Sequence, residues 1–288
     1  MRWADIAVAT TSQAQDAVSN LMIENGCGGV AIQGEAPVVV NCFLPVNDQI
    51  EQRLLRIQTR IKELSTFGLD VGPGEITIKY AEEKDWAEAW KQFYHTIKVG
   101  RRIVIKPAWE EYEPSRDDVV VELEPGMAFG TGLHATTRLC LEALEAHLRP
   151  GWNVVDFGTG SGILAMAAAK LGASLVIAFD ADETAARVAR QNVQRNDLEE
   201  FIEVHQTDKL DFITDQVDLV TANIISETIM TNADALARVL RTGGVLIASG
   251  ITENKSLDVE QSLRNAGFDI TDTLSEEEWV ALVARRAG

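Results

Sequence analysis

Residues 154–164 read VVDFGTGSGIL, in which an apolar β-branched run breaks into the alternating glycines Gly158, Gly160 and Gly162. An alanine-rich segment follows, and the next apolar run ends on an acid, Asp180. In a parallel sheet, this order places free backbone N–H groups and a carboxylate at the carboxyl ends of two strands, where adenosine-type ligands bind. The sequence therefore predicts a ligand site that includes Gly158, Gly160 and Asp180.

The spacing of these glycines indicates which ligand binds. Dinucleotide-binding loops follow the pattern G-x-G-x-x-G, whereas Ile163 stands here at the position of the third glycine. The alternating pattern leaves a wider turn without a close seat for a pyrophosphate. It favours a ligand with an adenine, ribose hydroxyls and an amino-acid tail, as S-adenosylmethionine has. The alternative is a purely structural strand–turn–helix.

A second glycine-rich segment, LEPGMAFGTGLHATT at 123–137, comes just before a predicted helix. Such a loop can fold over a ligand, and hydroxyls at a helix N-terminus can bind a carboxylate. Thr131, Thr136 and Thr137 supply such polar groups here, which favours a ligand-binding loop, although Thr136 or Thr137 could instead be only a helix cap. We expect no catalytic role for His134, because a single loop histidine is more often a hydrogen-bonding residue.

A third apolar run, VDLVTAN, ends at Asn223, whose amide would be costly to bury without a partner. The amide oxygen can accept a hydrogen bond from an amine whose lone pair faces an electrophilic methyl group. This makes Asn223 the predicted catalytic residue, with an asparagine at a strand corner as the alternative. Asp180 is expected to accept hydrogen bonds from ribose hydroxyls, and Asp182 to cap the next helix.

The first 82 residues alternate short strands with amphipathic helices in the order β-α-β-β-α-β, which is typical of the ferredoxin-like split unit. Predicted strands cover 3–9, 29–33, 38–44 and 75–80, and predicted helices cover 13–24 and 49–66. This part contains no cluster of acid, base or nucleophile. Target recognition and simple support are its two candidate roles.

From residue 135 onward, helices alternate with continuous apolar strands, which indicates a parallel sheet covered on both faces. Helices are predicted at 136–147, 163–171, 183–195, 227–240 and 256–265, and strands at 153–157, 174–179, 201–205, 217–222 and 245–249. Strands at 268–273 and 279–285 close as an antiparallel hairpin. The predicted fold is therefore α/β, a Rossmann-like sheet with a C-terminal hairpin, preceded by a small ferredoxin-like α+β domain.

The predicted domains are a substrate-recognition domain at 1–82, a linker helix and strand at 83–115, and a catalytic domain at 116–288. Asp85 would cap the linker helix, which leads to predicted strands at 102–106 and 119–123. The aromatic residues of that helix, Trp86 and Trp90 among them, are interpreted as packing residues.

Composition limits the classes of function. A length of 288 residues favours two domains, and a net charge of −18 disfavours a protein that follows phosphate backbones. The acidity would attract a lysine-rich protein partner, or it could serve solubility alone. Three scattered cysteines and four histidines predict neither a disulfide framework nor a metal site. Without a signal-peptide layout or a membrane-spanning run, we expect a cytoplasmic protein that binds no membrane.

The chain resembles the PrmA family, the methyltransferases of ribosomal large-subunit protein eleven. The resemblance is carried by LEPGMAFGTGLHATT, VVDFGTGSGILAMAAAKLGA, FDAD, TANI and EEEWVALVARR, in that order. The loop PGMAFGTGLHATT joined to TANI is its most specific part, because G-x-G-x-G alone occurs in many methyltransferases. The motifs run from about Asp85 to the C-terminus, and the layout of the N-terminal part is also similar.

The resemblance implies a class I methyltransferase domain preceded by a small domain that docks the ribosomal protein. It implies methyl transfer from S-adenosylmethionine to lysine amines, in some members also to the terminal α-amine, up to the trimethylated state. By position, it implies cofactor contacts at Thr137, Gly158, Asp180 and Asn223, with Thr131 and Gly160 nearby.

Other functions stay open at this point. The target could be another protein, a small molecule or a nucleic acid, although the absence of a basic stripe disfavours nucleic acid. A non-catalytic adaptor that binds S-adenosylmethionine is a further alternative. Asn223 and the glycine-rich loop at 123–137 disfavour it.

Overall fold

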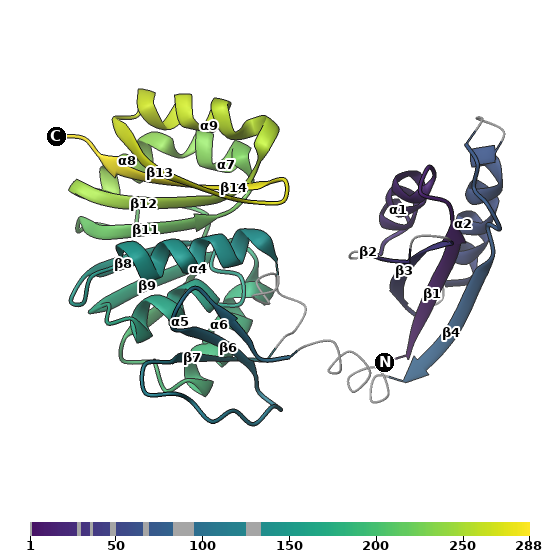
Figure 1. Cartoon of the computed structure of the whole chain (residues 1–288), viewed down its shortest axis with the longest axis horizontal. Helices are drawn as coiled ribbons and strands as arrows, with labels where there is room; N and C mark the ends of the chain where they lie inside the picture. Colours follow the sequence, from purple (N-terminus) through teal and green to yellow (C-terminus); the bar gives the residue numbers. More distant parts are fainter. Residues whose placement is uncertain are drawn as a thin grey trace. The chain divides into compact units, whose positions relative to one another are not determined.

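The structure is a computed structural model of the whole chain (Figure 1). It describes residues 2–27, 30–34, 37–46, 50–65, 69–82, 95–124 and 134–288. The chain divides into two compact units, Met1–Tyr94 and His95–Gly288, and each encloses a hydrophobic core of its own. The predicted linker helix with Asp85, Trp86 and Trp90 lies outside the described residues. The domain boundaries after residues 82 and 115 stay predictions.

The first unit is a four-stranded antiparallel sheet with two helices. Its elements are β1 (Arg2–Thr10), α1 (Gln15–Glu24), β2 (Val30–Gln33), β3 (Val38–Pro45), α2 (Ile50–Leu64) and β4 (Ile76–Glu82). The strand order β2-β3-β1-β4 is that of the predicted ferredoxin-like unit. Alternate strand residues such as Ile6 and Val40 are buried with Ile57 and Ile61 of α2, which follow helical spacing.

The prediction that the cysteines form no disulfide framework is wrong for one pair. Cys27, just after α1, is disulfide-bonded to Cys42 of β3, with their Cα atoms 6.0 Å apart. That separation lies within the range that a disulfide can span. This contact could not be predicted from local sequence patterns, because the end of α1 and the middle of β3 meet only in the folded unit.

The second unit holds every described residue of the predicted site. Its elements are β5 (Ile97–Val99), β6 (Ile103–Pro107), β7 (Val119–Leu123), α4 (Ala135–His147), β8 (Asn153–Phe157), α5 (Ile163–Lys170), β9 (Leu175–Asp180), α6 (Glu183–Arg195), β10 (Ile202–Gln206), β11 (Val217–Asn223), α7 (Ser226–Thr231), α8 (Ala233–Val239), β12 (Leu240–Thr252), α9 (Glu253–Asn265), β13 (Phe268–Glu276) and β14 (Trp279–Arg286).

The main sheet of this unit has seven strands in the order β10-β9-β8-β11-β12-β14-β13 (Figure 1). The first five strands are parallel, while β14 is antiparallel to both of its neighbours, β12 and β13. The predicted Rossmann-like sheet with a C-terminal antiparallel hairpin is therefore confirmed. A smaller sheet, β5-β6-β7, is part of the same unit.

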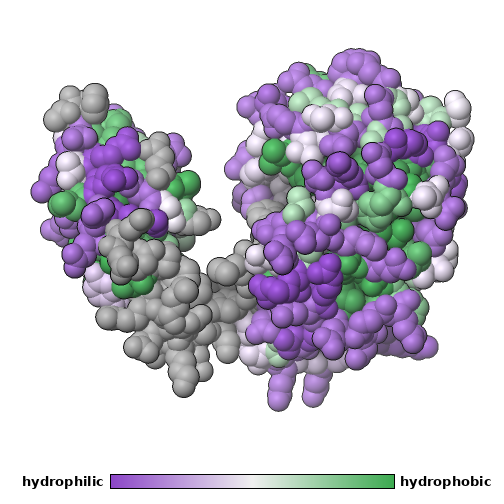
Figure 2. Space-filling view, turned by 180° about the vertical axis from the view of Figure 1, so that it is seen from behind, coloured by the Kyte–Doolittle hydropathy of each residue, from purple (hydrophilic) through white to green (hydrophobic). Residues whose placement is uncertain are grey.

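Both faces of the seven-stranded sheet are covered, as its continuous apolar strands predict. Val154 and Leu219 face one cluster, which includes residues of α4, α5 and the small sheet. Their neighbours Val155 and Val220 face the other cluster, which includes residues of α7, α8 and α9. Hydrophilic residues cover much of the face seen in Figure 2. None of the described helices is long and apolar enough to cross a membrane.

Several predicted elements differ from those observed. The predicted helix at 227–240 is two helices, α7 and α8, which meet at Asn232. Strand β12 begins at Leu240, earlier than predicted, because its pairing with β11 is irregular before it becomes regular at Val245. Strand β5 was not predicted, since three residues carry too little periodicity to be recognised.

Candidate active site

The glycine turn between β8 and α5 is fixed against the end of β9. The backbone N–H groups of Gly158 and Thr159 both donate to the carbonyl oxygen of Phe179, each at 2.9 Å. The N–H of Gly160 donates to Oδ2 of Asp180, also at 2.9 Å. The structure therefore brings together three of the predicted site residues, Gly158, Gly160 and Asp180.

Gly158 is required at its position for two reasons. Its φ of +73° lies in the left-handed region that side chains disfavour. A Cβ atom there would also collide with Cγ2 of Ile224, the residue after Asn223. On the other side, a Cβ on Gly250 at the end of β12 would collide with the backbone carbonyl of Ile224. Ile224 thus lies between two glycines, and this close packing fixes the end of β11 beside the turn.

Asp180 ends β9 as a half-buried carboxylate. It accepts hydrogen bonds from the N–H of Gly160 and from the N–H of Asp182, the latter at 3.0 Å. An ionised carboxylate has about four acceptor sites, so these two bonds leave capacity for the hydroxyls of a ribose. Asp182 caps α6 as predicted, because its carboxylate accepts from the N–H of Thr184 at 2.8 Å.

Asn223 and Thr137, predicted from separate parts of the chain, lie in contact. Asn223 ends β11 and is half-buried, and Thr137 is fully buried in the first turn of α4. The Nδ2 of Asn223 donates to the Oγ1 of Thr137 at 3.4 Å. Among the described residues, the Oδ1 of Asn223 has no hydrogen-bond partner in the fold. The catalytic role of Asn223 stays a prediction.

The loop before α4 is described only from His134 onward, so Thr131 lies outside the described residues. His134 is the N-cap of α4: its ring nitrogen accepts from the N–H of Thr136 at 3.3 Å and lies 2.9 Å from that residue's hydroxyl. The cap is therefore the histidine, not Thr136 or Thr137. His134 is therefore a hydrogen-bonding residue, as expected, and its lack of a catalytic role stays a prediction.

Asp156 is a residue of the site that sequence reasoning missed. It lies in β8, is buried, and accepts hydrogen bonds from Thr159 of the glycine turn and from Thr221 of β11, both at 2.6 Å. Burial raises the pKa of Asp156 above its ordinary value, while these two hydroxyls oppose that rise. The signal for this residue is an acid inside the otherwise apolar run VVDF.

A pocket of about 320 Å³ opens beside Asn223. Its lining consists of His134, Thr136, Asn223, Ile224, Ile225, Gly250 and Trp279. The rings of His134 and Trp279 meet edge to face, with centroids 4.9 Å apart. Trp279 comes from β14 and was not predicted. A smaller pocket of about 130 Å³, lined by Asn153, Leu175 and Val217 among others, lies at the opposite, amino ends of the strands.

The residues present fit S-adenosylmethionine. The Cβ position at Gly158 is occupied by Ile224, so this glycine lets the turn pack closely against the end of β11. Asp180 is an acceptor at the tip of the strand next to the turn, and it can serve ribose hydroxyls. Asn223 and Thr137 place polar groups on the other side of the turn, next to the pocket.

The mixed sheet, the glycine turn and the acid at the end of β9 define a class I methyltransferase domain. The chain belongs to the ribosomal protein L11 methyltransferase (PrmA) family, whose pattern it matches over residues 2–287. Enzymes of this family methylate ribosomal protein L11 and use S-adenosylmethionine.

Curated relatives agree over their whole length. The ribosomal protein L11 methyltransferase of Anoxybacillus flavithermus is 40% identical over 311 aligned positions, which cover 99% of this chain and 100% of that protein. The protein of the same name from Bacillus cereus (strain B4264) is 39% identical, with both chains covered completely. A crystal structure of the ribosomal protein L11 methylase from Lactobacillus delbrueckii subsp. bulgaricus is 35% identical, with a TM-score of 0.64 over 68% of this chain and 100% of that one.

The contact between Gly158 and Ile224 can be tested by Gly158→Ala. We expect the affinity for S-adenosylhomocysteine, the demethylated product, to fall by about tenfold or more, because the new Cβ displaces Ile224 and the turn. Gly267→Ala is the matched control: its φ of +85° is equally unfavourable, but a Cβ there has no neighbour within 4 Å. That control should lose about 1–2 kcal/mol of stability and keep its affinity in calorimetry. Equal affinities for Gly158→Ala and the wild type would contradict the assignment.

Proposed function

We propose that this chain transfers methyl groups from S-adenosylmethionine to lysine amines of ribosomal protein L11, up to the trimethylated state. The observation that supports this best is the meeting of Gly158, Gly160 and Asp180 with Asn223 and Thr137 at one edge of the sheet. Membership of the L11 methyltransferase family over nearly the whole chain supports the target. Since the target is a ribosomal protein, we infer action in the cytoplasm.

In this proposal, Gly158 and Gly160 accommodate the cofactor against the turn, and Asp180 accepts from its ribose hydroxyls. Thr137, Asn223 and Thr131 complete the set of cofactor contacts. When bound, the cofactor supplies a methyl group that its sulfonium centre already activates, so alignment of the acceptor is the main task of the protein. Asn223 performs that task by accepting a hydrogen bond from the lysine amine at its Oδ1.

The acceptor amine must be neutral, although a lysine has a reference pKa of about 10.4. The pocket beside Asn223 favours the neutral form, because Ile224 and Trp279 present apolar and aromatic surface that displaces water. An amide oxygen orients the amine without stabilising ammonium as a carboxylate would. The lysine therefore loses its proton to solvent on entering the pocket, and no strong base is needed.

The proposal is tested with purified wild-type protein, radiolabelled S-adenosylmethionine and separate ribosomal proteins of comparable lysine content. We expect label in ribosomal protein L11 and, by mass spectrometry, lysines that carry up to three methyl groups. Label in a different ribosomal protein would mean that the chain carries out the same reaction on another target. Cofactor binding without methyl transfer to any protein would instead favour the function of a non-catalytic adaptor.

The role of Asn223 can be tested by Asn223→Ala, which should lower turnover on L11 more than it weakens cofactor binding. The reason is that the amide oxygen is assigned to the acceptor, whereas several other residues contact the cofactor. Asn223→Asp tests the electrostatics: a carboxylate stabilises the ammonium and raises the pKa of the lysine, so activity should be partly recovered at higher pH. If Asn223→Ala kept near-wild-type turnover with cofactor bound, Asn223 would have only a structural role at the end of β11.

We also propose that residues 1–82 dock the ribosomal protein, with 83–115 as the linker and 116–288 as the catalytic domain. The separate cores of the two compact units support two domains, although β5 and β6 of the proposed linker pack in the core of the second unit. A chain that starts at Asp85 should bind S-adenosylhomocysteine with wild-type affinity in calorimetry and lose methylation of L11. Full activity of the shortened chain would show that the first unit is not the docking element.

A further inference from the structure

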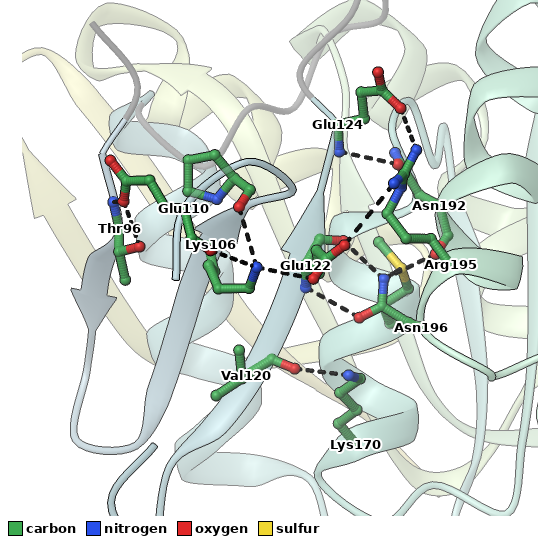
Figure 3. A network of polar contacts seen from close by, with 12 residues as sticks. Thr96, Lys106, Glu110, Val120, Glu122, Glu124, Lys170, Asn192, Arg195 and Asn196 are labelled. Atoms are coloured by element: carbon green, nitrogen blue, oxygen red, sulfur yellow. Dashed lines mark hydrogen bonds and ion pairs between the residues drawn. The ribbon is translucent and has the colours of Figure 1, made fainter. Parts of the chain in front are cut away.

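One buried side chain connects the glycine turn to a strand outside the main sheet. Asn192 lies in the last turn of α6 and is 1% exposed. Its Nδ2 donates to the carbonyl oxygen of Ser161, between Gly160 and Gly162, at 2.9 Å. Its Oδ1 accepts from the N–H of Glu124, directly after β7, at 3.2 Å (Figure 3). One carboxamide thus holds two separate parts of the backbone.

Within the part of the chain that the structure describes, no strand pairs with the outer edge of β7, and side chains bond to its backbone groups instead. Nζ of Lys170 donates to the carbonyl of Val120 at 2.7 Å. The amide of Asn196, the residue that ends α6, pairs with both backbone groups of Glu122, at 2.7 and 3.0 Å (Figure 3). Asn192 continues this row at Glu124. Because unpaired buried backbone groups are costly, this row fixes β7 to α5 and α6.

Asn192 and Asn196 differ in one respect that matters for the site. Both bond to the same stretch of backbone, but among the described residues the hydrogen bonds of Asn196 reach Glu122, Asn192 and Met166, and none involves the glycine turn. Asn192 alone of the two bonds to Ser161. A role in fold stability is common to both residues, whereas a role in the geometry of the turn belongs to Asn192.

We propose that Asn192 is a positioning residue for cofactor binding. Its carboxamide sets the orientation of the Ser161 peptide and thereby the N–H groups of the glycine turn, relative to the end of β7. It touches neither cofactor nor acceptor in this role. The proposal rests on the function proposed above and assigns to the turn a second support in addition to Asp180.

The test compares Asn192→Ala with the matched control Asn196→Ala in the full-length protein, by calorimetry with S-adenosylhomocysteine and by steady-state kinetics on L11. Both variants should unfold at lower temperature than the wild type. We expect Asn192→Ala to raise the dissociation constant of S-adenosylhomocysteine, and the KM for S-adenosylmethionine, by about tenfold or more, because the Ser161 carbonyl loses its donor. For Asn196→Ala we expect both constants to stay within about twofold of the wild type.

Asn192→Asp is a second variant of nearly equal volume. A carboxylate keeps the acceptor for the N–H of Glu124 and has no donor for the Ser161 carbonyl, so it should bind cofactor as weakly as Asn192→Ala. Wild-type affinity in either folded Asn192 variant, or an equal loss in Asn196→Ala, would overturn the proposal. Failure of both Asn192 variants to fold would also overturn it, because the residue would then be a core residue alone. A wild-type protein that binds no S-adenosylhomocysteine would instead refute the proposed function.

Discussion

The buried carboxylate of Asp156 joins the two halves of the site. It accepts from Thr159 in the glycine turn and from Thr221 two residues before Asn223, so one carboxyl group holds β8, the turn and β11 together. The hydroxyl bonds offset the cost of burying this polar group among apolar strands. With the turn and β11 fixed, Ile224 packs between Gly158 and Gly250, and Asn223 meets Thr137. These contacts within the folded chain therefore hold most of the candidate site in position.

Gly158, Gly160, Asp180 and Asn223 could be predicted from the sequence because each follows directly from the end of an apolar strand, and the carboxyl ends of parallel strands lie at one edge. Asp156 could not, because its burial is evident only with Thr159 and Thr221 around it. Trp279 joins the pocket because β14 inserts between β12 and β13, which local patterns do not encode. Asn192 resembles an ordinary polar helix residue until β7 is placed beside α6.

The order of elements in both units was predictable because periodicity within each helix and strand is a local property. Strands β7 and β8 and helix α6 match the prediction residue by residue. Prediction failed where tertiary context decides, as at the break between α7 and α8 at Asn232 and in the pairing of Cys27 with Cys42. Disulfides are rare in the cytosol. An oxidised Cys27–Cys42 pair in cells would therefore argue against the inferred cytoplasmic location.

Amide hydrogen exchange of the full-length protein, with and without S-adenosylhomocysteine, tests most directly that these scattered segments form one cofactor site. The account predicts that protection rises together in the glycine turn at 157–163, at the end of β9 at 179–183, at the end of β11 at 222–226 and in the first turn of α4 at 134–139. The smaller pocket at 212–217 should be unaffected. Protection confined to 212–217, or absent from the glycine turn, would contradict it.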